Sequence, residues 1–229
     1  MRVPQLKENP KGSQKWIQVL INACPELFNN RIRERVRNLS GRDICWVSPL
    51  KKDDFAEYRD RAFLERIGLD ELSEELGKFW PKNGPQWDAL GKTSDGETFF
   101  LVEAKANLPE LVSFCGATNK NSLSTISDSL AKTQGWITCR NFSIDWKCGF
   151  YQYANRLAHL YFLGKMKKEA YLIFLYFVDD PTHISTSCEE WNAALELQKK
   201  LLGLSAKNLT GKVMDIFINI NEIRAFHGA

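Results

Sequence analysis

The stretch PQWDALGKTSDGETFFLVEAKAN, from Pro85 to Asn107, contains two runs of strand-like sequence joined by a turn signal. Residues 98–104 form an almost unbroken apolar run of aromatic and β-branched residues, typical of a strand that is covered on both faces. Residues 86–92 predict a second strand, and Asp95-Gly96 between them is the signal of a two-residue hairpin turn. The stretch therefore predicts an antiparallel hairpin inside a sheet.

Side chains alternate between the two faces of a strand, and in this run the alternation separates apolar from charged residues. The even-numbered side chains face one way and are all apolar, namely Phe100, Val102 and Ala104. The odd-numbered side chains begin with Phe99 and Leu101 and become charged at the end of the strand, at Glu103 and Lys105. Two opposite charges are thus expected together on one face.

The hairpin register brings a third charged residue to the same place. With Asp95 and Gly96 as the loop, Asp88 lies directly opposite Glu103, and the Cβ atoms of such pairs are about 4.5–5.5 Å apart. Two carboxylates at that separation repel each other unless a proton or a cation lies between them. A hard, oxygen-seeking ion such as Mg²⁺ suits this pair, and Lys105 would then hold an attacking water or the charge that develops on a phosphate.

Asp88, followed by Glu103-Ala104-Lys105 at the end of an apolar strand, resembles the PD-(D/E)xK nuclease superfamily. The resemblance implies an α/β, restriction-endonuclease-like three-layer fold: a central mixed β-sheet flanked by helices, with an αβββαβ core and N- and C-terminal additions. It also implies Mg²⁺- or Mn²⁺-dependent phosphodiester hydrolysis, with Asp88, Glu103 and Ala104 at the metal and Lys105 as the catalytic lysine. The chain departs from the family's pattern in having Trp87, rather than a proline, directly before Asp88.

The helix before the hairpin supplies a further candidate. Residues 70–80 predict a helix with an apolar stripe, and Glu75 lies immediately beside that stripe. Many members of the resembled superfamily supply an additional acidic residue from this helix, which makes Glu75 the candidate here. The alternative is a plain surface glutamate.

The helix after the hairpin carries a row of polar side chains. Residues 142–163 predict a long helix with Gln152, Asn155, Arg156 and His159 at helical spacing. In branches of the superfamily a glutamine or tyrosine from this helix reaches the site, and Gln152 and Tyr153 are the matching positions. We expect Gln152 or Arg156 to contact substrate or metal-bound water, the alternative being an exposed helix face. His159 is expected to be a structural histidine.

The rest of the chain completes an alternating pattern of helices and strands in one globular domain. Residues 1–12 predict a loose leader and 13–68 a largely helical N-terminal addition, and residues 108–121 predict a mobile loop beside the site. The other expected helices are 13–23, 25–39, 53–67, 122–137 and one from 185 or 187 to 202. The other expected strands are 44–47, 170–178 and 214–220, with 170–178 parallel to a neighbour.

Net charge, cysteine spacing and apolar runs indicate which partners, metal sites and cellular locations fit this sequence. The net charge of +3 in 229 residues permits a nucleic-acid partner without requiring one. Six cysteines with no C-x2-C pair predict reduced, mostly buried thiols rather than a zinc site. The absence of a signal-peptide pattern and of a long apolar run predicts a cytoplasmic protein without a membrane partner. The oligomeric state stays open, a homodimer being one alternative.

Two functions of different class are compatible with these residues. The first is a divalent-metal-dependent nuclease that acts on DNA or, less favoured, on RNA. The second is a catalytically silent nucleic-acid-binding or accessory protein that keeps the fold. A purely structural alternative makes Glu103 and Lys105 a salt bridge at a strand end and Asp88 a turn or edge residue. Because all three residues are present, the nuclease is favoured.

Overall fold

The computed structural model describes residues 1–36, 39, 41–137, 144–204, 209 and 211–227. Its centre is a five-stranded mixed sheet in the order β2-β4-β5-β6-β7. The first three of these strands pair antiparallel, whereas β5, β6 and β7 pair in parallel. The bounds are β2 Ile44–Ser48, β4 Ala89–Thr93, β5 Thr98–Lys105, β6 Glu169–Val178 and β7 Val213–Asn219.

The hairpin of β4 and β5 has the register expected from the sequence. Ala89 lies opposite Val102, and Lys92 lies opposite Phe99, as the predicted register requires. Asp88 lies just before β4, and its backbone N–H donates to the Val102 carbonyl at 3.2 Å. The connection is longer than the predicted two-residue turn and spans residues 94–97. It is closed by the Thr93 hydroxyl, which accepts the Thr98 N–H at 3.0 Å. The register is therefore confirmed, while the turn type is corrected.

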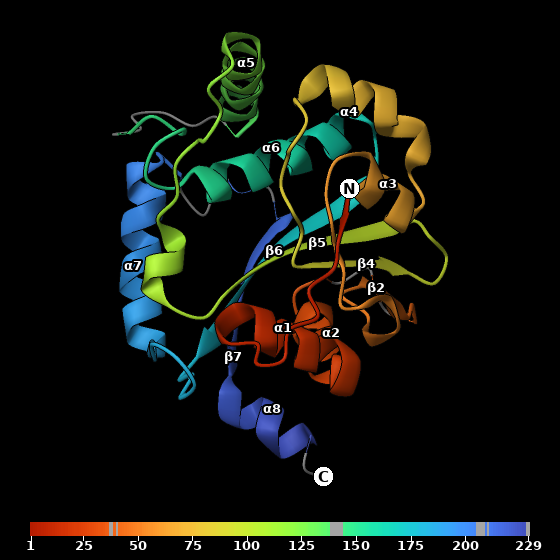
Figure 1. Cartoon of the computed structure of the whole chain (residues 1–229), viewed down its shortest axis with the longest axis vertical. Helices are drawn as coiled ribbons and strands as arrows, with labels where there is room; N and C mark the ends of the chain where they lie inside the picture. The colour runs from red at the N-terminus through yellow and green to blue at the C-terminus, as the bar shows by residue number, and fades with distance from the viewer. Residues whose placement is uncertain (37–38, 40, 138–143, 205–208, 210, 228–229) are drawn as a thin grey trace.

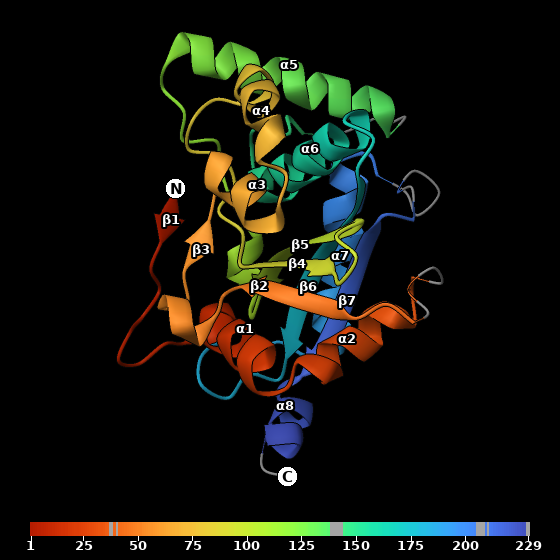
Figure 2. The same cartoon turned by 90° about the vertical axis from the view of Figure 1, so that its right-hand side faces the viewer.

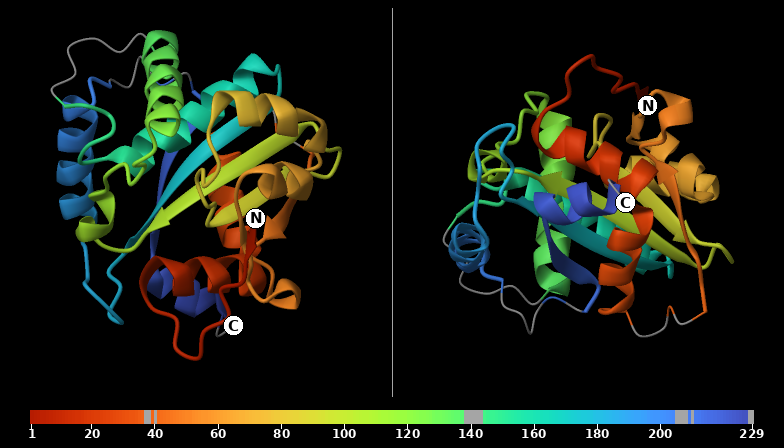
Figure 3. Two further views of the ribbon diagram at one scale, coloured as in Figure 1. Left: turned by 45° about the horizontal axis from the view of Figure 1, so that its top comes forward. Right: turned by 90° about the horizontal axis from the view of Figure 1, so that it is seen from below.

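Strand β5 is covered on both faces, as its apolar run predicts. Phe100, Val102 and Ala104 belong to one hydrophobic cluster, and Phe99 and Leu101 belong to another. The first cluster lies under α1 Gly12–Ala23, α2 Pro25–Arg33 and α8 Ile220–His227, which are gathered on one face of the sheet (Figures 1 and 3). Helices α1, α2 and α8 thus form a layer on this face of the sheet.

The second cluster lies under the helices of the opposite face (Figure 2). Helix α6, Tyr151–Lys165, packs directly on the sheet, and its Tyr153 stacks on Phe174 of β6 with ring centroids 4.0 Å apart. Helix α5, Lys120–Trp136, lies outside α6, farther from the sheet (Figure 2). The helices of this side are α3 Arg61–Ile67, α4 Ser73–Phe79, α5 Lys120–Trp136, α6 Tyr151–Lys165 and α7 Cys188–Leu201. The molecule is an α/β protein with a mixed sheet between two helical layers.

The N-terminal part differs from the predicted leader and helix. Residues 54–60 are not helical: a 3₁₀ turn, Lys51–Asp53, leads into the short strand β3, Glu57–Tyr58, which pairs with β1, Arg2–Val3. Asp54, Phe55 and Asp60 have positive φ values of 53°, 50° and 54°, a conformation that interrupts a right-handed helix. The first residues are therefore tied to the fold rather than loose.

Several other boundaries also move. Helix α2 ends at Arg33 instead of near residue 39, the helix expected over 70–80 is a 3₁₀ turn, Asp70–Leu72, followed by α4, and α6 begins at Tyr151. Residues 144–149, expected to be helical, form bends and turns, Phe150 forms a β-bridge with Ser113, and 142–143 lie outside the described residues. Residues 221–227, which are not among the expected helices, belong to α8. Strand β6 is parallel to both neighbours, as predicted.

The cysteine expectation holds only in part. The described cysteines are free thiols, but Cys45, Cys148 and Cys188 are exposed and only Cys24 is buried, so "mostly buried" was wrong. Cys139 lies outside the described residues. Within the described residues, none of the helices combines the length and the apolar character that a membrane span needs.

Candidate active site

A cavity of about 440 Å³ opens where β5 ends beside the first turns of α6. Asp88 reaches it from the bend before β4, and Glu103 and Lys105 reach it from the last residues of β5. Helix α6 contributes Gln152, Asn155 and Arg156, and β3 contributes Glu57. Other lining residues are Ser13, Asn83, Gly84, Pro85, Gln86, Ala104, Ser113, Phe114 and Tyr151.

The three residues predicted from the hairpin lie together in this cavity. Lys105 Nζ contacts Glu103 Oε1 at 2.6 Å, which places both side chains on the same face of β5. Asp88 Oδ2 accepts the backbone N–H of Ala104 at 2.7 Å, across the hairpin. The period of two along β5 and the hairpin register produce this arrangement.

Gln152 meets the same lysine from α6. Its Oε1 accepts a hydrogen bond from Lys105 Nζ at 3.0 Å, and its backbone N–H donates to Ser113 Oγ at 2.8 Å. The structure thus brings Gln152 to the triad, as the resemblance implied. Tyr153, the alternative position on this helix, instead points into the core against Phe174.

Arg156 lies deeper and engages the other oxygen of Glu103. Its Nε donates to Glu103 Oε2 at 2.7 Å, and its Nη2 contacts the same oxygen and donates to the Gln86 carbonyl at 2.7 Å. The guanidinium lies over the Trp87 ring, 4.9 Å from its centroid. The side chains of Arg156 and Glu103 are only 5% and 3% exposed, so this is a buried ion pair.

Glu57 is a site residue that the sequence did not indicate. Its carboxylate accepts hydrogen bonds from Gln86 Nε2 at 2.5 Å and Gln5 Nε2 at 3.4 Å. Burial raises the pKa of Glu57, the hydrogen bond from Gln86 offsets part of that rise, and the charge of Glu103 adds to it. Nothing in the local pattern signals this role, because the residue lies in a segment that predicts an exposed helix.

Glu75 does not reach the cavity, which corrects the expectation for this residue. It pairs with Lys78 at 2.8 Å on the solvent side of α4 and lines a separate hollow with Lys132 and Tyr161. Helix α4 spans only residues 73–79, and its buried side chain, Leu76, fixes which face turns inward. The additional carboxylate of the cavity is that of Glu57.

His159 has a structural environment, as expected. It is buried among the rings of Phe63, Phe79, Trp80 and Trp87, and its Nδ1 lies 2.9 Å from the Asn155 carbonyl. Burial lowers the pKa of His159 to about 3. The ring therefore stays neutral at physiological pH.

Negative charge in the cavity is only partly neutralised. Burial works to raise the pKa of Glu103, but the charges of Arg156 and Lys105 outweigh it and lower this pKa. The pKa of Asp88 is raised well above its usual range by burial and by the charges of Glu103 and Glu57. Burial alone would lower the pKa of Lys105, yet Glu103 and Asp88 raise it, so the lysine stays charged. Without a further cation, the charged form of Asp88 is therefore the one that this cavity disfavours most strongly.

This charge distribution suits a divalent cation. Asp88 and Glu103 offer carboxylate oxygens, and Ala104 can offer only its backbone carbonyl. Among the described residues, no group of three or more His, Cys, Asp and Glu side chains is arranged to hold a metal by itself. Mg²⁺ does not need such a cage, because it is commonly bound by one or two carboxylates together with waters and substrate phosphates. The donor set therefore fits Mg²⁺ or Mn²⁺.

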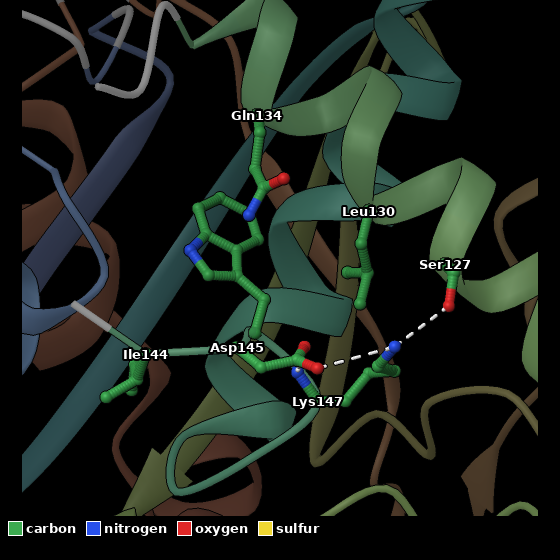
Figure 4. A pocket seen from close by; sticks show the side chains of 7 residues that line it. Ser127, Leu130, Gln134, Ile144, Asp145 and Lys147 are labelled. Carbon is green, nitrogen blue, oxygen red and sulfur yellow. Dashed lines mark hydrogen bonds and ion pairs between the residues drawn. The ribbon is translucent and has the colours of Figure 1, made fainter. Parts of the chain in front are cut away.

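A second hollow lies between α5 and residues 144–147 (Figure 4). Among the described residues that line it, the one carboxylate is that of Asp145, which pairs with Lys147 Nζ at 3.4 Å, and this lysine also donates to Ser127 Oγ at 3.0 Å. The remaining lining is formed by Leu130, Gln134, Ile144 and Trp146. This hollow lacks the paired carboxylates of the first cavity, so the chemistry is sought at Asp88 and Glu103.

Comparison of the chain with protein-family models, with curated proteins and with solved structures finds no match. The likeness of residues 85–107 to a nuclease superfamily therefore stays a prediction from those residues. The geometry of the cavity is what supports a function.

Proposed function

We propose that this protein is a divalent-metal-dependent nuclease that hydrolyses phosphodiester bonds, in DNA more than in RNA. The observation that carries the proposal is the joint placement of Asp88, Glu103 and Lys105 in one open cavity at the end of the β4–β5 hairpin, with Glu103 and Lys105 on the same face of β5. The order of elements also supports it, since three antiparallel strands, a helical crossover and a parallel strand follow one another as in an αβββαβ core. The preference for DNA rests on the superfamily resemblance alone.

In this proposal some residues of the cavity bind the metal ion, and Lys105 positions the attacking water or a phosphate oxygen. Asp88, Glu103 and the Ala104 carbonyl would hold Mg²⁺ or Mn²⁺, which polarises a phosphoryl oxygen and lowers the pKa of a bound water. A protonated lysine has three N–H donors. Two donors of Lys105 are directed at Glu103 Oε1 and Gln152 Oε1, which leaves the third for an attacking water or a phosphate oxygen. Gln152 and Glu103 together fix where that third donor points.

A second candidate is a silent nucleic-acid-binding or accessory protein, and one observation favours it. Both oxygens of Glu103 already have cationic partners, Lys105 on Oε1 and Arg156 on Oε2. A metal must then share these oxygens with two fixed positive charges. A carboxylate has about four lone-pair directions, so sharing is compatible with its geometry. Metal affinity decides between the candidates.

Metal binding and cleavage can be separated by two variants. We expect Mn²⁺ titrated calorimetrically to bind the unmodified chain and Lys105→Met with similar affinity, because Lys105 is not a ligand. Asp88→Asn should weaken binding of the ion itself. Cleavage of single-stranded DNA, double-stranded DNA and RNA, followed on gels, should fall by about 10²-fold or more in Lys105→Met.

The outcomes separate the two candidates. Binding of Mn²⁺ without cleavage of any of the three substrates would favour the accessory protein. A chain that binds no divalent ion would overturn the nuclease proposal.

A further inference from the structure

The rim of the cavity carries an exposed aromatic ring. Phe114 lines the same cavity as Asp88, Glu103 and Lys105, and it is 66% exposed. Isolated exposed apolar residues are common on protein surfaces and usually need no explanation. Phe114 differs because it stands at the mouth of a cavity built from charged groups.

The backbone on both sides of Phe114 is held in place. Ser113 N–H donates to the Gly149 carbonyl at 2.8 Å, and Cys115 N–H donates to the Lys147 carbonyl at 2.9 Å. Ser113 also accepts the Tyr151 N–H at 3.2 Å, which ties this segment to the start of α6. Its neighbours in the chain are partly buried, so Phe114 alone of the three turns outward. The ring is therefore presented by a fixed segment, and little conformational entropy is lost when a ligand packs on it.

A flat apolar ring beside phosphate-directed groups matches the chemistry of a nucleotide. Aromatic side chains bind unpaired bases by stacking, a contact that is tolerant of sequence. Bases inside a duplex already stack on each other and do not offer a free face, whereas bases in single strands, loops and ends do. The exposed ring of Phe114 therefore favours substrates with unpaired bases over fully paired duplexes.

We propose that Phe114 is a stacking platform for an unpaired base next to the phosphate bound at Asp88, Glu103 and Lys105. The substrate class is then single-stranded nucleic acid or the single-stranded part of a larger substrate. This inference rests on the proposed function, since it assumes that a phosphodiester occupies the cavity. The Gln152 N–H donates to Ser113 Oγ at 2.8 Å. The segment that carries Phe114 is therefore hydrogen-bonded to Gln152, the residue whose side chain accepts from Lys105.

Binding of short fluorescein-labelled DNA tests the proposal. Fluorescence anisotropy is measured with a single strand and with a blunt duplex of the same sequence, in Ca²⁺ in place of Mg²⁺, with a gel to confirm that the DNA stays intact. We expect the unmodified chain to prefer the single strand. Phe114→Ala should weaken single-strand binding about tenfold, which corresponds to about 1.4 kcal/mol, and change duplex binding less than about twofold.

Two further variants make the test specific. Phe114→Trp should restore single-strand binding, because indole also stacks on bases. Phe226→Ala is the matched control: Phe226 is 51% exposed on α8, which lies on the opposite face of the sheet from α6, and its loss should change neither affinity. Both phenylalanines are exposed, so neither alanine variant is expected to unfold.

The outcomes separate this inference from the nuclease proposal. Equal single-strand affinity for Phe114→Ala and the unmodified chain overturns the stacking platform. An equal loss of affinity for both DNAs, or a chain that does not bind the single strand at all, overturns it as well. A Phe114-dependent preference for the single strand in a chain that cleaves nothing in Mn²⁺ supports the platform while overturning the nuclease.

Discussion

Replacing Arg156 with methionine removes the buried cation that faces Glu103. Methionine keeps an apolar, flexible chain against Trp87 but provides none of the hydrogen bonds that the guanidinium makes to Glu103, Gln86 and Asn155. Glu103 would then remain in the interior with Lys105 as its one cationic partner among the described residues. The variant therefore measures how much unfolding free energy is lost when this buried carboxylate keeps one cationic partner instead of two.

The expected loss of unfolding free energy in Arg156→Met follows from the burial of both side chains of the ion pair. Removing one partner of a buried ion pair costs about 3–5 kcal/mol of unfolding free energy, because the remaining charge is desolvated and unpaired. Both side chains of the pair are at most 5% exposed, so solvent screening is small. Since Lys105 still bonds Oε1, we expect the low end, about 3 kcal/mol. The pair of Arg61 with Glu65 is 73% and 46% exposed, and Arg61→Met should cost less than about 0.5 kcal/mol.

The loss of unfolding free energy in Arg156→Met should be smaller at acidic pH than at neutral pH. The folded chain lowers the pKa of Glu103, so this group stabilises the fold above its unfolded pKa, about 4.3, and that contribution is lost as the pH falls through the folded value. Without Arg156 the burial of Glu103 is opposed by one cation fewer, and its folded pKa should rise. The difference between the unmodified chain and Arg156→Met should therefore be largest near neutral pH and shrink in acid.

Urea unfolding followed by tryptophan fluorescence, without divalent ions, measures these differences. The double variant Arg156→Met with Glu103→Gln removes the stranded charge, so it should lose less than the sum of the two single losses. If Arg156→Met loses no more than Arg61→Met, or if the two single losses simply add, then the buried pair does not stabilise the fold as described.

Two other changes test the charge balance of the cavity. Asp88 has a raised pKa, so its contribution to stability is complete below its unfolded pKa, about 3.9, and is lost as the pH rises through the folded value. In metal-free buffer Asp88→Asn should therefore unfold at a higher temperature than the unmodified chain at pH 8 and at a similar temperature near pH 3; a lower unfolding temperature at pH 8 would contradict this. Glu57→Gln should weaken Mn²⁺ binding about tenfold in calorimetry, as expected for a carboxylate close to metal ligands. Glu75→Gln is its matched control and should change nothing, and equal effects of the two would remove Glu57 from the site.

Local periodicity was enough to predict the hairpin and its charged end. The alternation along β5 separates the apolar side chains from Glu103 and Lys105, and the hairpin register follows from the position of its turn. These features depend on neighbours within about twenty residues, where backbone geometry leaves few alternatives. The predicted positions of β6 and α7 were close for the same reason, since each is a long run with strong periodicity.

Tertiary structure decided which contacts residues distant in the sequence make with that hairpin. Glu57 enters the cavity because β3 pairs with β1 at the start of the chain, and Arg156 reaches Glu103 across 53 residues of sequence. Glu75 lies in a helix of the expected type, yet the packing of Leu76 turns it away. Periodicity shows which face of a helix is buried, but not what that face is buried against. That choice depends on how the whole chain fills its core, and a local stretch of sequence does not contain it.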